Sequence, residues 1–485
     1  MGREIPRPFF MLESLLLFLI LFFPPETNSV FFLLIVSCAL IVFYKNKTFP
    51  SIEWYLVVFL FFLTLFLYPS SLSLYYIFVF AIAFSFFYFN NFRERDFVLP
   101  LWAISIYGII QLFNWPSLSE AVSNQNLFEV TQGIITQLRI FSRFALPTTF
   151  GAVLGMLLPL VIKDAKKRKS SRALIVVMVI LIILTRSLGA VLVAALSCGV
   201  FFAIKGRRKI AISILAISVL ALAGVVILRG TQIKKHPSWK LRVYHWKNAV
   251  LSLKEKPVTG IGWRRFFTFS KRFIKKGEPE SLYVHNAFLQ FLVEGGIIPL
   301  LGVLVFSLGF RVRKDLHAEF LGAGAGWVLH NFIDIGFYFP SIALLGGIIF
   351  SQLMKSRKNG RASLVLFLIF TLSILPFYEK SRLENMKWTL RKGESIKISS
   401  VEEILFSIDD EAQLLLYRIT GDVKFLHRAL KIYPENPSVF YQLSLYYLRQ
   451  GAIANSEMMA KACLLLNPTH EGAKEILKGL RENEK

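Results

Sequence analysis

The sequence has few cysteines and no pattern of residues that would hold a metal ion. Its 485 residues include 3 cysteines, Cys38, Cys198 and Cys463, which stand far apart in apolar segments. This spacing argues against both a disulfide framework and a zinc site. We therefore predict no metal and no cofactor, and we expect chemistry to rest on arginine, histidine and backbone groups.

The motifs of common soluble enzymes are missing as well. The chain has no P-loop, no G-x-S-x-G, no H-E-x-x-H and no C-x-x-C. Acidic residues are scarce, because 31 Asp and Glu stand against 56 Lys and Arg, a net charge of +25. The pair Asp409-Asp410 lies in the C-terminal part, where we interpret it as the start of a helix.

Long apolar runs, by contrast, are abundant. Hydrophobic residues make up 55% of the chain, which is high for a soluble protein of this length. Apolar segments recur from residue 8 to residue 377, and most are long enough to cross a hydrocarbon core of roughly 30 Å. We predict an all-α, polytopic membrane protein of about 12 to 13 spans. The predicted spans are 8–24, 29–44, 54–69, 72–90, 97–115, 146–162, 173–185, 189–204, 210–228, 286–310, 318–335, 340–354 and 362–377.

Charge in the loops predicts the orientation of these spans. Lys and Arg crowd the short loops at 163–172, 205–209, 311–314 and 355–361, which all fall on one side. Short basic loops stay in the cytoplasm, so the N-terminus is predicted to be cytoplasmic. The long loop 229–285 and the residues after 378 then face outward. We predict a membrane domain over 1–378 and an extracytoplasmic domain over 379–485.

The long outer loop is strongly basic, with 14 Lys or Arg against 3 Glu in residues 229–284, a net of +11. A face that meets lipid headgroups would explain this charge. A site for an anionic substrate at the outer surface explains it better, and a nucleic-acid partner is not expected there. Residues 116–145 have apolar residues at helical spacing, which predicts an amphipathic interfacial helix that brings Arg139 and Arg143 to the same side.

The C-terminal segment repeats with a fixed period. Pro434 and Pro468 are 34 residues apart, and Leu430 and Leu464 keep the same offset. This period resembles the tetratricopeptide repeat, a pair of antiparallel helices. We predict a helical-repeat domain that binds a protein partner or packs on its own neighbour.

His285 and Asn286 stand where a predicted span begins. Histidine can accept or pass a proton near neutral pH, whereas Asn286 is equally suited to cap the helix. Asn286, Gln290 and Glu294 follow at intervals of four and share one helix face. An ionisable group such as Glu294 within a span predicts a functional role or a partner for an arginine.

Arginine and glycine complete the candidate site. Arg242 can bind phosphate oxygens at two points or anchor the loop at the interface. Gly260-Ile261-Gly262 predicts a turn whose backbone approaches a ligand. Arg186 lies in a short outer turn. The topology predicts that these residues meet at one outer surface, with five members: Arg143, Arg186, Arg242, His285 and Asp334.

One predicted span, 318–335, carries two further patterns. His330 and Asp334 are four residues apart, which suits a structural pair as well as a place in the site. Gly322 and Gly326 form a GxxxG pattern that indicates close helix packing.

Taken together, the central residues form the pattern R-x3-W…P-x-x-G-x-G…H-N-x-x-L-x-x-x-x-E-x-G. In this pattern the chain resembles the O-antigen ligase/polymerase superfamily of bacterial membrane glycosyltransferases, over about residues 50–360. The matching residues are Arg242, Trp246, Pro257, Gly260, Gly262, His285, Asn286, Leu289, Glu294 and Gly296. Arg143…Pro147 resembles an R…P-N stretch with Thr148 in place of Asn. The S-R-G-A turn departs from the family, because Leu188 stands at the arginine position and Arg186 comes two residues earlier.

The resemblance implies a GT-C-like helical fold in the bacterial inner membrane and an undecaprenyl-diphosphate-linked glycan as donor. It also implies lipid A–core or another glycan as acceptor. Arg242, with Arg186 and Arg143, would stabilise the leaving diphosphate, and His285 would orient or deprotonate the acceptor hydroxyl. Gly260, Gly262, Asn286 and Glu294 would help to bind substrate.

Several readings remain open at this point. Within the enzymes, a ligase, a polymerase of repeat units and a protein O-oligosaccharyltransferase share donor and fold, and only the acceptor differs. A lipid or glycan transporter would place its polar residues at the membrane midplane, whereas here they gather at one surface. A scaffold would leave the charged loop unexplained.

Overall fold

The computed structural model describes the following parts of the chain: residues 10–22, 52–67, 71–88, 92–114, 139–144, 146–228, 238–275, 278, 280–313, 315–356, 379, 382–383, 385–387, 389–390, 396 and 409–483. These residues are mostly helical, which confirms the predicted helical character for this part of the chain. The exception is a small antiparallel sheet of β1 (Phe310–Val312) and β2 (Met354–Ser356), in which Phe310 pairs with Ser356.

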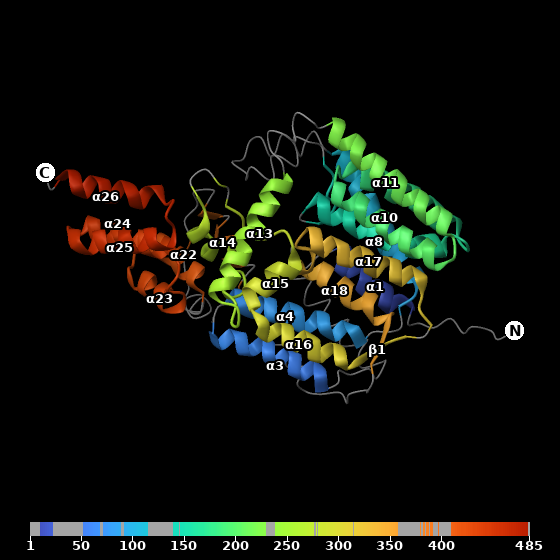
Figure 1. The fold of residues 1–485 in the computed structure, drawn as a ribbon, viewed down its shortest axis with the longest axis horizontal. Coiled ribbons are helices and arrows are strands. Elements are labelled where there is room, and N and C mark those ends of the chain that lie inside the picture. The colour runs from blue at the N-terminus through green and yellow to red at the C-terminus, as the bar shows by residue number, and fades with distance from the viewer. Residues whose placement is uncertain are drawn as a thin grey trace. The chain divides into compact units, whose positions relative to one another are not determined.

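The chain divides into two compact units, whose helices carry the labels of Figure 1. The first unit comprises residues 1–55, 79–237 and 307–371, and the second comprises 56–78, 238–306 and 372–485. This division describes packing alone. The predicted boundary between a membrane domain and an extracytoplasmic domain at residue 378 concerns the membrane, and it stays a prediction.

The first unit is a bundle of helices. Its members are α1 (Phe10–Phe22), η1 (Phe86–Tyr88), η2 (Glu94–Phe97), α5 (Val98–Phe113), α8 (Pro147–Asp164), α9 (Lys169–Leu184), α10 (Leu188–Ile204), α11 (Arg208–Leu228), α17 (Ala318–Ile333), η4 (Gly336–Tyr338) and α18 (Pro340–Ser351). Helix α10 packs against α8, α11 and α17. A side chain at Gly322 or Gly326 would overlap Ser197 of α10, so the predicted close packing at the GxxxG pattern is confirmed.

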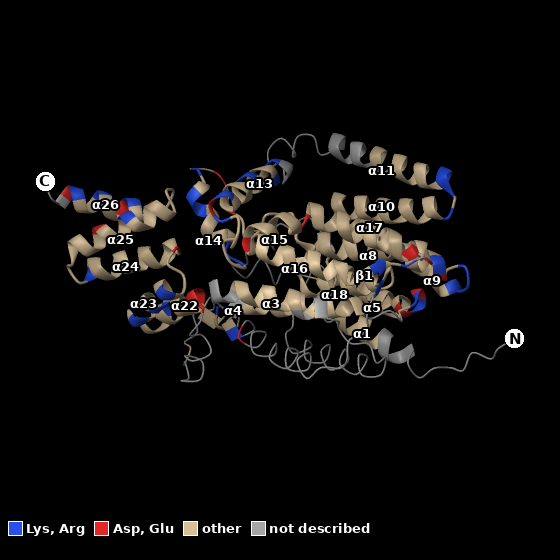
Figure 2. Ribbon diagram, turned by 60° about the horizontal axis from the view of Figure 1, so that its bottom comes forward, with Lys and Arg blue, Asp and Glu red and all other residues tan. Residues whose placement is uncertain are grey.

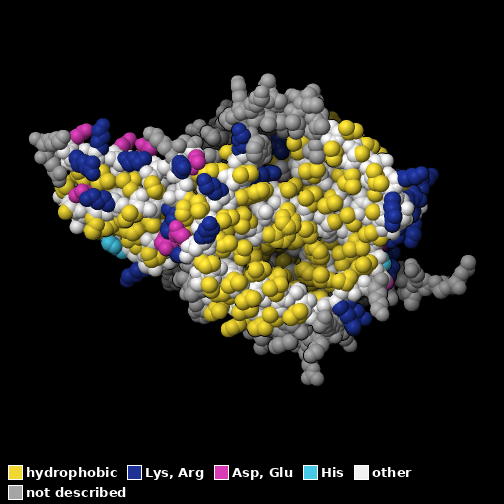
Figure 3. Space-filling model, in the orientation of Figure 1, with side chains coloured by type: hydrophobic (Ala, Val, Ile, Leu, Met, Phe, Trp, Pro, Cys, Tyr) yellow, Lys and Arg dark blue, Asp and Glu magenta, His cyan; other side chains and the backbone are white. Residues whose placement is uncertain are grey.

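Charged and apolar side chains are separated on this unit. Figure 2 shows Lys and Arg gathered at one end, at the turns that join α8 to α9 and α10 to α11. Between the ends, Figure 3 shows hydrophobic side chains spread over the helices. Val176, Ile183, Ile212 and Leu220 are among the exposed apolar residues. Such a surface is costly in water and suits a hydrocarbon surrounding.

Two helical stretches among the described residues, Glu94–Phe113 and Pro147–Asp164, are long and apolar enough to cross a membrane. The pair α15 (Ala287–Gly295) and α16 (Ile297–Leu308) would make a third if it is one span. The spans predicted at 29–44 and 362–377 lie outside the described residues, as does most of segment 116–145. Within that segment, residues 139–144 are described and are not helical. The count of 12 to 13 spans stays a prediction.

The span predicted over 286–310 is not a single helix. Helices α15 and α16 meet at an angle of 118°. Gly296, between them, has a φ of +69°, and a Cβ there would overlap the carbonyl group of Val258. The polar chain before α15 thus packs against the point at which the helix ends, and the bend follows from that contact.

The second unit joins the loop helices to the C-terminal helices. Its members are α13 (Ser238–Glu255), α14 (Phe266–Ser270), η3 (Lys271–Phe273), α15, α16, α22 (Asp410–Thr420), α23 (Lys424–Ile432), α24 (Pro437–Arg449), α25 (Ile453–Leu466) and α26 (Glu471–Asn483). Helices α3 (Ile52–Leu67) and α4 (Ser71–Ser85) are divided between the two units, and the last two residues of α16 belong to the first.

A small core holds the loop helices of this unit together. It consists of buried side chains from α13, α14, α15 and the chain between them: Ala249, Ile261, Phe266, Phe269, Val284 and Val293. Trp263 is also buried; its Nε1–H donates to the Thr64 hydroxyl (2.9 Å), and its ring lies 5.3 Å from that of Phe291. The predicted turn at Gly260-Gly262 is therefore followed directly by a buried tryptophan that anchors it.

In the C-terminal segment, α24 and α25 pack side by side (Figure 1), and the Ser456 hydroxyl donates to the Ser444 carbonyl (2.9 Å). Pro434 and Pro468 each follow the end of a helix, α23 and α25, by two residues. Paired helices of this kind fit the predicted repeat, whose assignment as tetratricopeptide-like stays a prediction.

Candidate functional site

The turn at residues 256–262 is bound to the end of α15. Gly260 and Gly262 have φ values of +66° and +95°, which glycine adopts far more readily than other residues. The N–H groups of Ile261 and Gly262 donate to the carbonyls of Val293 and Glu294, both at 3.0 Å. The predicted turn is present, and its glycines serve close contact between two stretches of backbone.

Replacing Gly260 with alanine should therefore be severe. The new Cβ would overlap the carbonyl group of Glu294, and the φ of +66° would be strained as well. We expect the Gly260→Ala protein to lose more than about 3 kcal/mol of stability and to lose activity. Thermal unfolding of the purified protein checks this.

Gly451 provides the matched control, because its φ is +71° and nothing lies within 4 Å of a Cβ added there. The Gly451→Ala variant should lose only about 1–2 kcal/mol of stability, because it has the cost of the positive φ but no steric overlap. Equal losses at the two positions would show that contact with Glu294 does not matter.

Polar side chains at Asn286, Gln290 and Glu294 line one face at α15. The Asn286 side chain caps the helix by accepting from the Leu289 N–H (2.9 Å), so the capping interpretation of Asn286 is confirmed. Gln290 accepts from the Val284 N–H (3.1 Å), and its Nε2–H donates to Glu294 Oε1 (3.2 Å). Gln290 and Glu294 are buried, which fixes the segment before the helix against the helix itself.

His285 lies just before this cap in a strained conformation, with a φ of +57°. Its ring centroid is 6.1 Å from that of His245, which α13 contributes. His245 is buried, and burial, together with repulsion from His285, lowers the pKa of His245 to about 4. His245 is therefore neutral at pH 7, and it can accept or donate one hydrogen bond without adding charge.

Arg242 lies one helical turn before His245 on α13, so both side chains share a face of that helix. The Arg242 side chain is half-buried. Helix α13 packs against α15, which places Arg242 and His285 on adjoining elements of one unit. His245 was not among the predicted site residues, although its spacing of three from Arg242 was a usable signal.

Arg186 belongs to the first unit. It occupies the turn between α9 and α10 with a φ of +50°, is exposed, and is followed by Ser187, which caps α10. Arg186 borders an open cavity of about 830 Å³ whose walls come from α8, α9, α10 and α11 and are almost wholly apolar. Arg139 Nε–H donates to the Thr185 carbonyl (3.0 Å), which ties segment 139–144 to this turn.

Arg143 lies in the same unit and is held by local partners. Its Nε–H donates to the carbonyl of Phe22 (3.2 Å), and Nη1–H donates to the Tyr107 hydroxyl (3.4 Å). Its guanidinium also lies over the Tyr107 ring, 5.1 Å from the centroid. These contacts favour a structural part for Arg143 in addition to the predicted role at the site.

His330 and Asp334 close α17 in the first unit. Both are buried, and the Asp334 N–H donates to the His330 carbonyl (2.8 Å) as the helix ends. The Asp334 carboxylate accepts from the N–H of Ile335 (2.9 Å). The structure thus groups Arg143, Arg186 and Asp334 in one unit and the remaining predicted site residues in the other.

Backbone strain coincides with the predicted site in both units. Among the described residues, the non-glycine positions with positive φ are Ser142, Arg186, Arg264 and His285. Each costs of the order of 1–3 kcal/mol unless its surroundings compensate, and such residues cluster at functional sites. Three of the four are predicted site residues or neighbours of one. The fourth, Arg264, was not singled out from the sequence.

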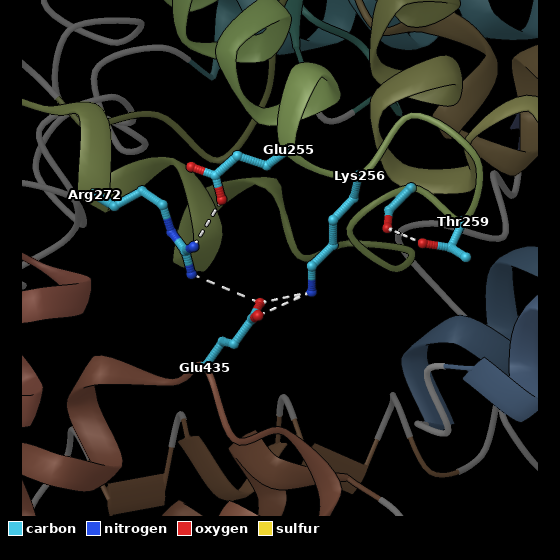
Figure 4. Close-up of polar contacts among 6 residues, drawn as sticks. Glu255, Lys256, Thr259, Arg272 and Glu435 are labelled. Atoms are coloured by element: carbon cyan, nitrogen blue, oxygen red, sulfur yellow. Dashed lines mark hydrogen bonds and ion pairs between the residues drawn. The ribbon is translucent and has the colours of Figure 1, made fainter.

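A cluster of charges joins the loop to the C-terminal helices within the second unit (Figure 4). Glu435 accepts from Lys256 Nζ at 2.9 Å and lies 3.6 Å from Arg272 Nη2. Arg272 Nη1–H also donates to Glu255 (2.9 Å), and the Thr259 hydroxyl donates to the carbonyl of Gly260 (3.1 Å). The turn that carries Gly260 is thereby fixed to the chain just before α24.

A buried ion pair reinforces this junction. Arg265 donates to the Asp410 carboxylate, and both side chains are almost completely inaccessible to solvent. The other Asp410 oxygen accepts from Asn436 Nδ2–H (2.8 Å), and the Arg265 guanidinium lies 4.1 Å from the centroid of the Tyr433 ring. Asp409 caps α22 as predicted, by accepting from the Ala412 N–H (2.8 Å), whereas the pairing of Asp410 was missed.

No group of three or more His, Cys, Asp or Glu that could hold a metal ion occurs among the described residues. Around α13, the glycine turn and α15, the polar groups include the imidazoles of His245 and His285, the guanidinium of Arg242 and the amide of Gln290. Such groups can bind an oxyanion, stabilise developing negative charge and move a proton.

Residues 173–304 match the model of a family described as O-antigen ligase. The matched segment includes α9 and α10 with Arg186, and it continues through α13, the glycine turn and α15. The comparison with curated proteins returns no match.

Proposed function

Residues 173–304 place this chain in the O-antigen ligase superfamily, a superfamily of bacterial integral membrane enzymes, and from this premise we propose its reaction. We propose that it transfers a glycan from undecaprenyl diphosphate to an acceptor hydroxyl on lipid A–core. In this proposal the chain lies in the inner membrane, with the basic turns of Figure 2 in the cytoplasm and the loop and C-terminal helices in the periplasm.

The observation that carries the proposal is the grouping of Arg242 and His245 on α13 with His285 just before α15, inside the matched segment. The acceptor oxygen attacks the anomeric carbon and forms the new glycosidic bond. The bond from that carbon to the diphosphate oxygen breaks, and the lipid diphosphate leaves. His285 takes the proton of the hydroxyl, and Arg242 stabilises the charge on the diphosphate.

The cavity beside Arg186 supports a lipid-linked donor. An apolar chain fits its apolar walls, and a phosphate at the end of that chain would meet the exposed guanidinium of Arg186. Arg186 and Arg242 are therefore both proposed to bind phosphate. Because they belong to different units of the chain, each can be substituted separately to compare its effect on transfer.

Deletion of the gene tests the proposal. We expect the deletion strain to show bare lipid A–core on a gel of surface glycolipids, while long polymer accumulates on the lipid carrier. The Arg242→Ala protein should fail to restore ligation and Arg242→Lys should restore it only in part, because lysine offers a point charge without the planar fork. Core capped by single repeat units, with no long polymer on any carrier, would instead indicate a polymerase.

A further inference from the structure

Two consecutive arginines follow the glycine turn, and their surroundings differ. Arg265 is neutralised by Asp410 within the protein. Arg264, by contrast, has no carboxylate oxygen within 4.0 Å among the residues that the structure describes. Its Nη1–H donates to the Tyr283 hydroxyl, and its guanidinium lies 4.5 Å from the centroid of the Tyr283 ring. Most of its five N–H donors thus have no partner in this part of the protein.

The backbone conformation at Arg264 favours glycine over arginine. Its φ is +65°, a conformation that glycine adopts freely and arginine does not. The chain therefore carries a long cationic side chain at a position where its backbone conformation is unfavourable. The side chain is partly exposed, and its hydrogen bond and ring contact with Tyr283 do not engage most of its N–H donors.

The location of the side chain supplies a reason. Tyr283 lies two residues before His285, so the Arg264 guanidinium rests on the segment that carries His285. Glu294, at the other end of α15, attracts the guanidinium at longer range. A cation with spare donors beside a candidate catalytic histidine is suited to receive an oxyanion from outside the protein.

We infer that Arg264 is a substrate-binding residue whose guanidinium holds a phosphate group of the lipid-linked donor beside His285. This inference rests on the proposed function. The hydrogen bond and ring contact with Tyr283 hold the guanidinium in place, and its unused N–H groups can donate to two phosphate oxygens. A lipid headgroup offers the same phosphate chemistry, so the test must separate the two sources.

Glycine is the informative substitution here. Arg264→Gly removes the charge and, because glycine favours this φ, relieves the backbone at the same time. We expect its melting temperature to equal or exceed that of the parent protein, while the KM for the lipid-diphosphate donor rises about 10- to 100-fold, as for the loss of a charge-assisted hydrogen bond. The donor KM of Arg264→Lys should lie between that of the parent protein and that of Arg264→Gly. Lys254→Ala, which removes an exposed loop charge, should leave the donor KM unchanged.

A binding measurement accompanies the kinetics. Inorganic pyrophosphate should raise the melting temperature of the full-length parent protein in detergent and of Lys254→Ala, but not that of Arg264→Gly. Mixed micelles that contain phosphatidylglycerol should affect all three proteins alike. If Arg264→Gly keeps its response to pyrophosphate and loses only the response to phosphatidylglycerol, the side chain binds headgroups and the inference is overturned.

The remaining outcomes separate this inference from the proposed function. If the parent protein transfers no glycan from a lipid diphosphate, the proposed function fails, and the pyrophosphate shift alone decides the role of Arg264. If the parent is active and Arg264→Gly has an unchanged donor KM, the inference fails by itself. A lower melting temperature of Arg264→Gly would show that the Arg264 side chain stabilises the fold through Tyr283. This result would overturn the inference as well.

Discussion

Replacement of His285 with asparagine should abolish glycan transfer while the protein remains in the membrane. Asparagine tolerates positive φ better than other non-glycine residues, so it preserves the backbone at +57° and removes only the imidazole. Loss of a general base lowers a rate by about 10²–10⁴-fold. We expect a fall in this range, with little change in the KM for the donor, in a transfer assay on purified protein.

The control for this prediction is His427→Asn, because His427 is exposed on the outside of α23. Its rate should match that of the parent protein. A His285→Asn enzyme that retains full activity would remove the imidazole from the mechanism, and His245, the neutral neighbour 6.1 Å away, would be the next residue to test.

Replacement of Arg265 with alanine should produce the largest loss of stability. The change leaves the Asp410 carboxylate buried without its cation, next to Asp409, whose pKa is already raised by burial and by the charge of Asp410. Removal of one partner from a buried pair costs about 3–5 kcal/mol. We expect a corresponding fall in thermal stability, and a further fall in activity because the glycine turn is held by the same junction.

Two further variants show whether the charge is responsible. The double variant Arg265→Met with Asp410→Leu removes both charges and should recover most of the lost stability, since apolar replacements of buried pairs are often neutral. Lys461→Ala breaks an exposed pair with Glu457 and should cost less than about 1 kcal/mol. If the double variant is as unstable as Arg265→Ala, the loss of stability comes from lost packing on Tyr433 and not from the unpaired charge of Asp410.

Much of the helical layout could be predicted from the chain, because apolar runs and basic turns are local signals. The turn at Arg186, the cap at Asn286 and the glycine turn appear at the predicted residues. The bend at Gly296 could not be predicted, because a straight helix and a bent pair of helices can have the same apolar sequence pattern. What breaks it is the carbonyl of Val258, a contact made by another part of the chain.

The candidate site was predicted best where its residues are close in sequence. His245 was missed because its role depends on the ring of His285, 40 residues later in the chain, and Asp410 was missed because its partner stands 145 residues earlier. Arg264 was missed because a single arginine in a loop with 14 cationic residues has no distinguishing spacing. Its φ and its contact with Tyr283 become visible only in three dimensions.

The pairing of Arg265 with Asp410 also has a consequence for the order of events during synthesis. Ribosomes add about 5–20 residues per second, so the 145 residues that separate the two partners take roughly 7–30 s to make. During that interval the loop is already complete, while the carboxylate that neutralises its arginine does not yet exist. The chain that follows the glycine turn therefore acquires its final support only when the last helices emerge, and a nascent chain stalled before α22 would carry this loop without its buried ion pair.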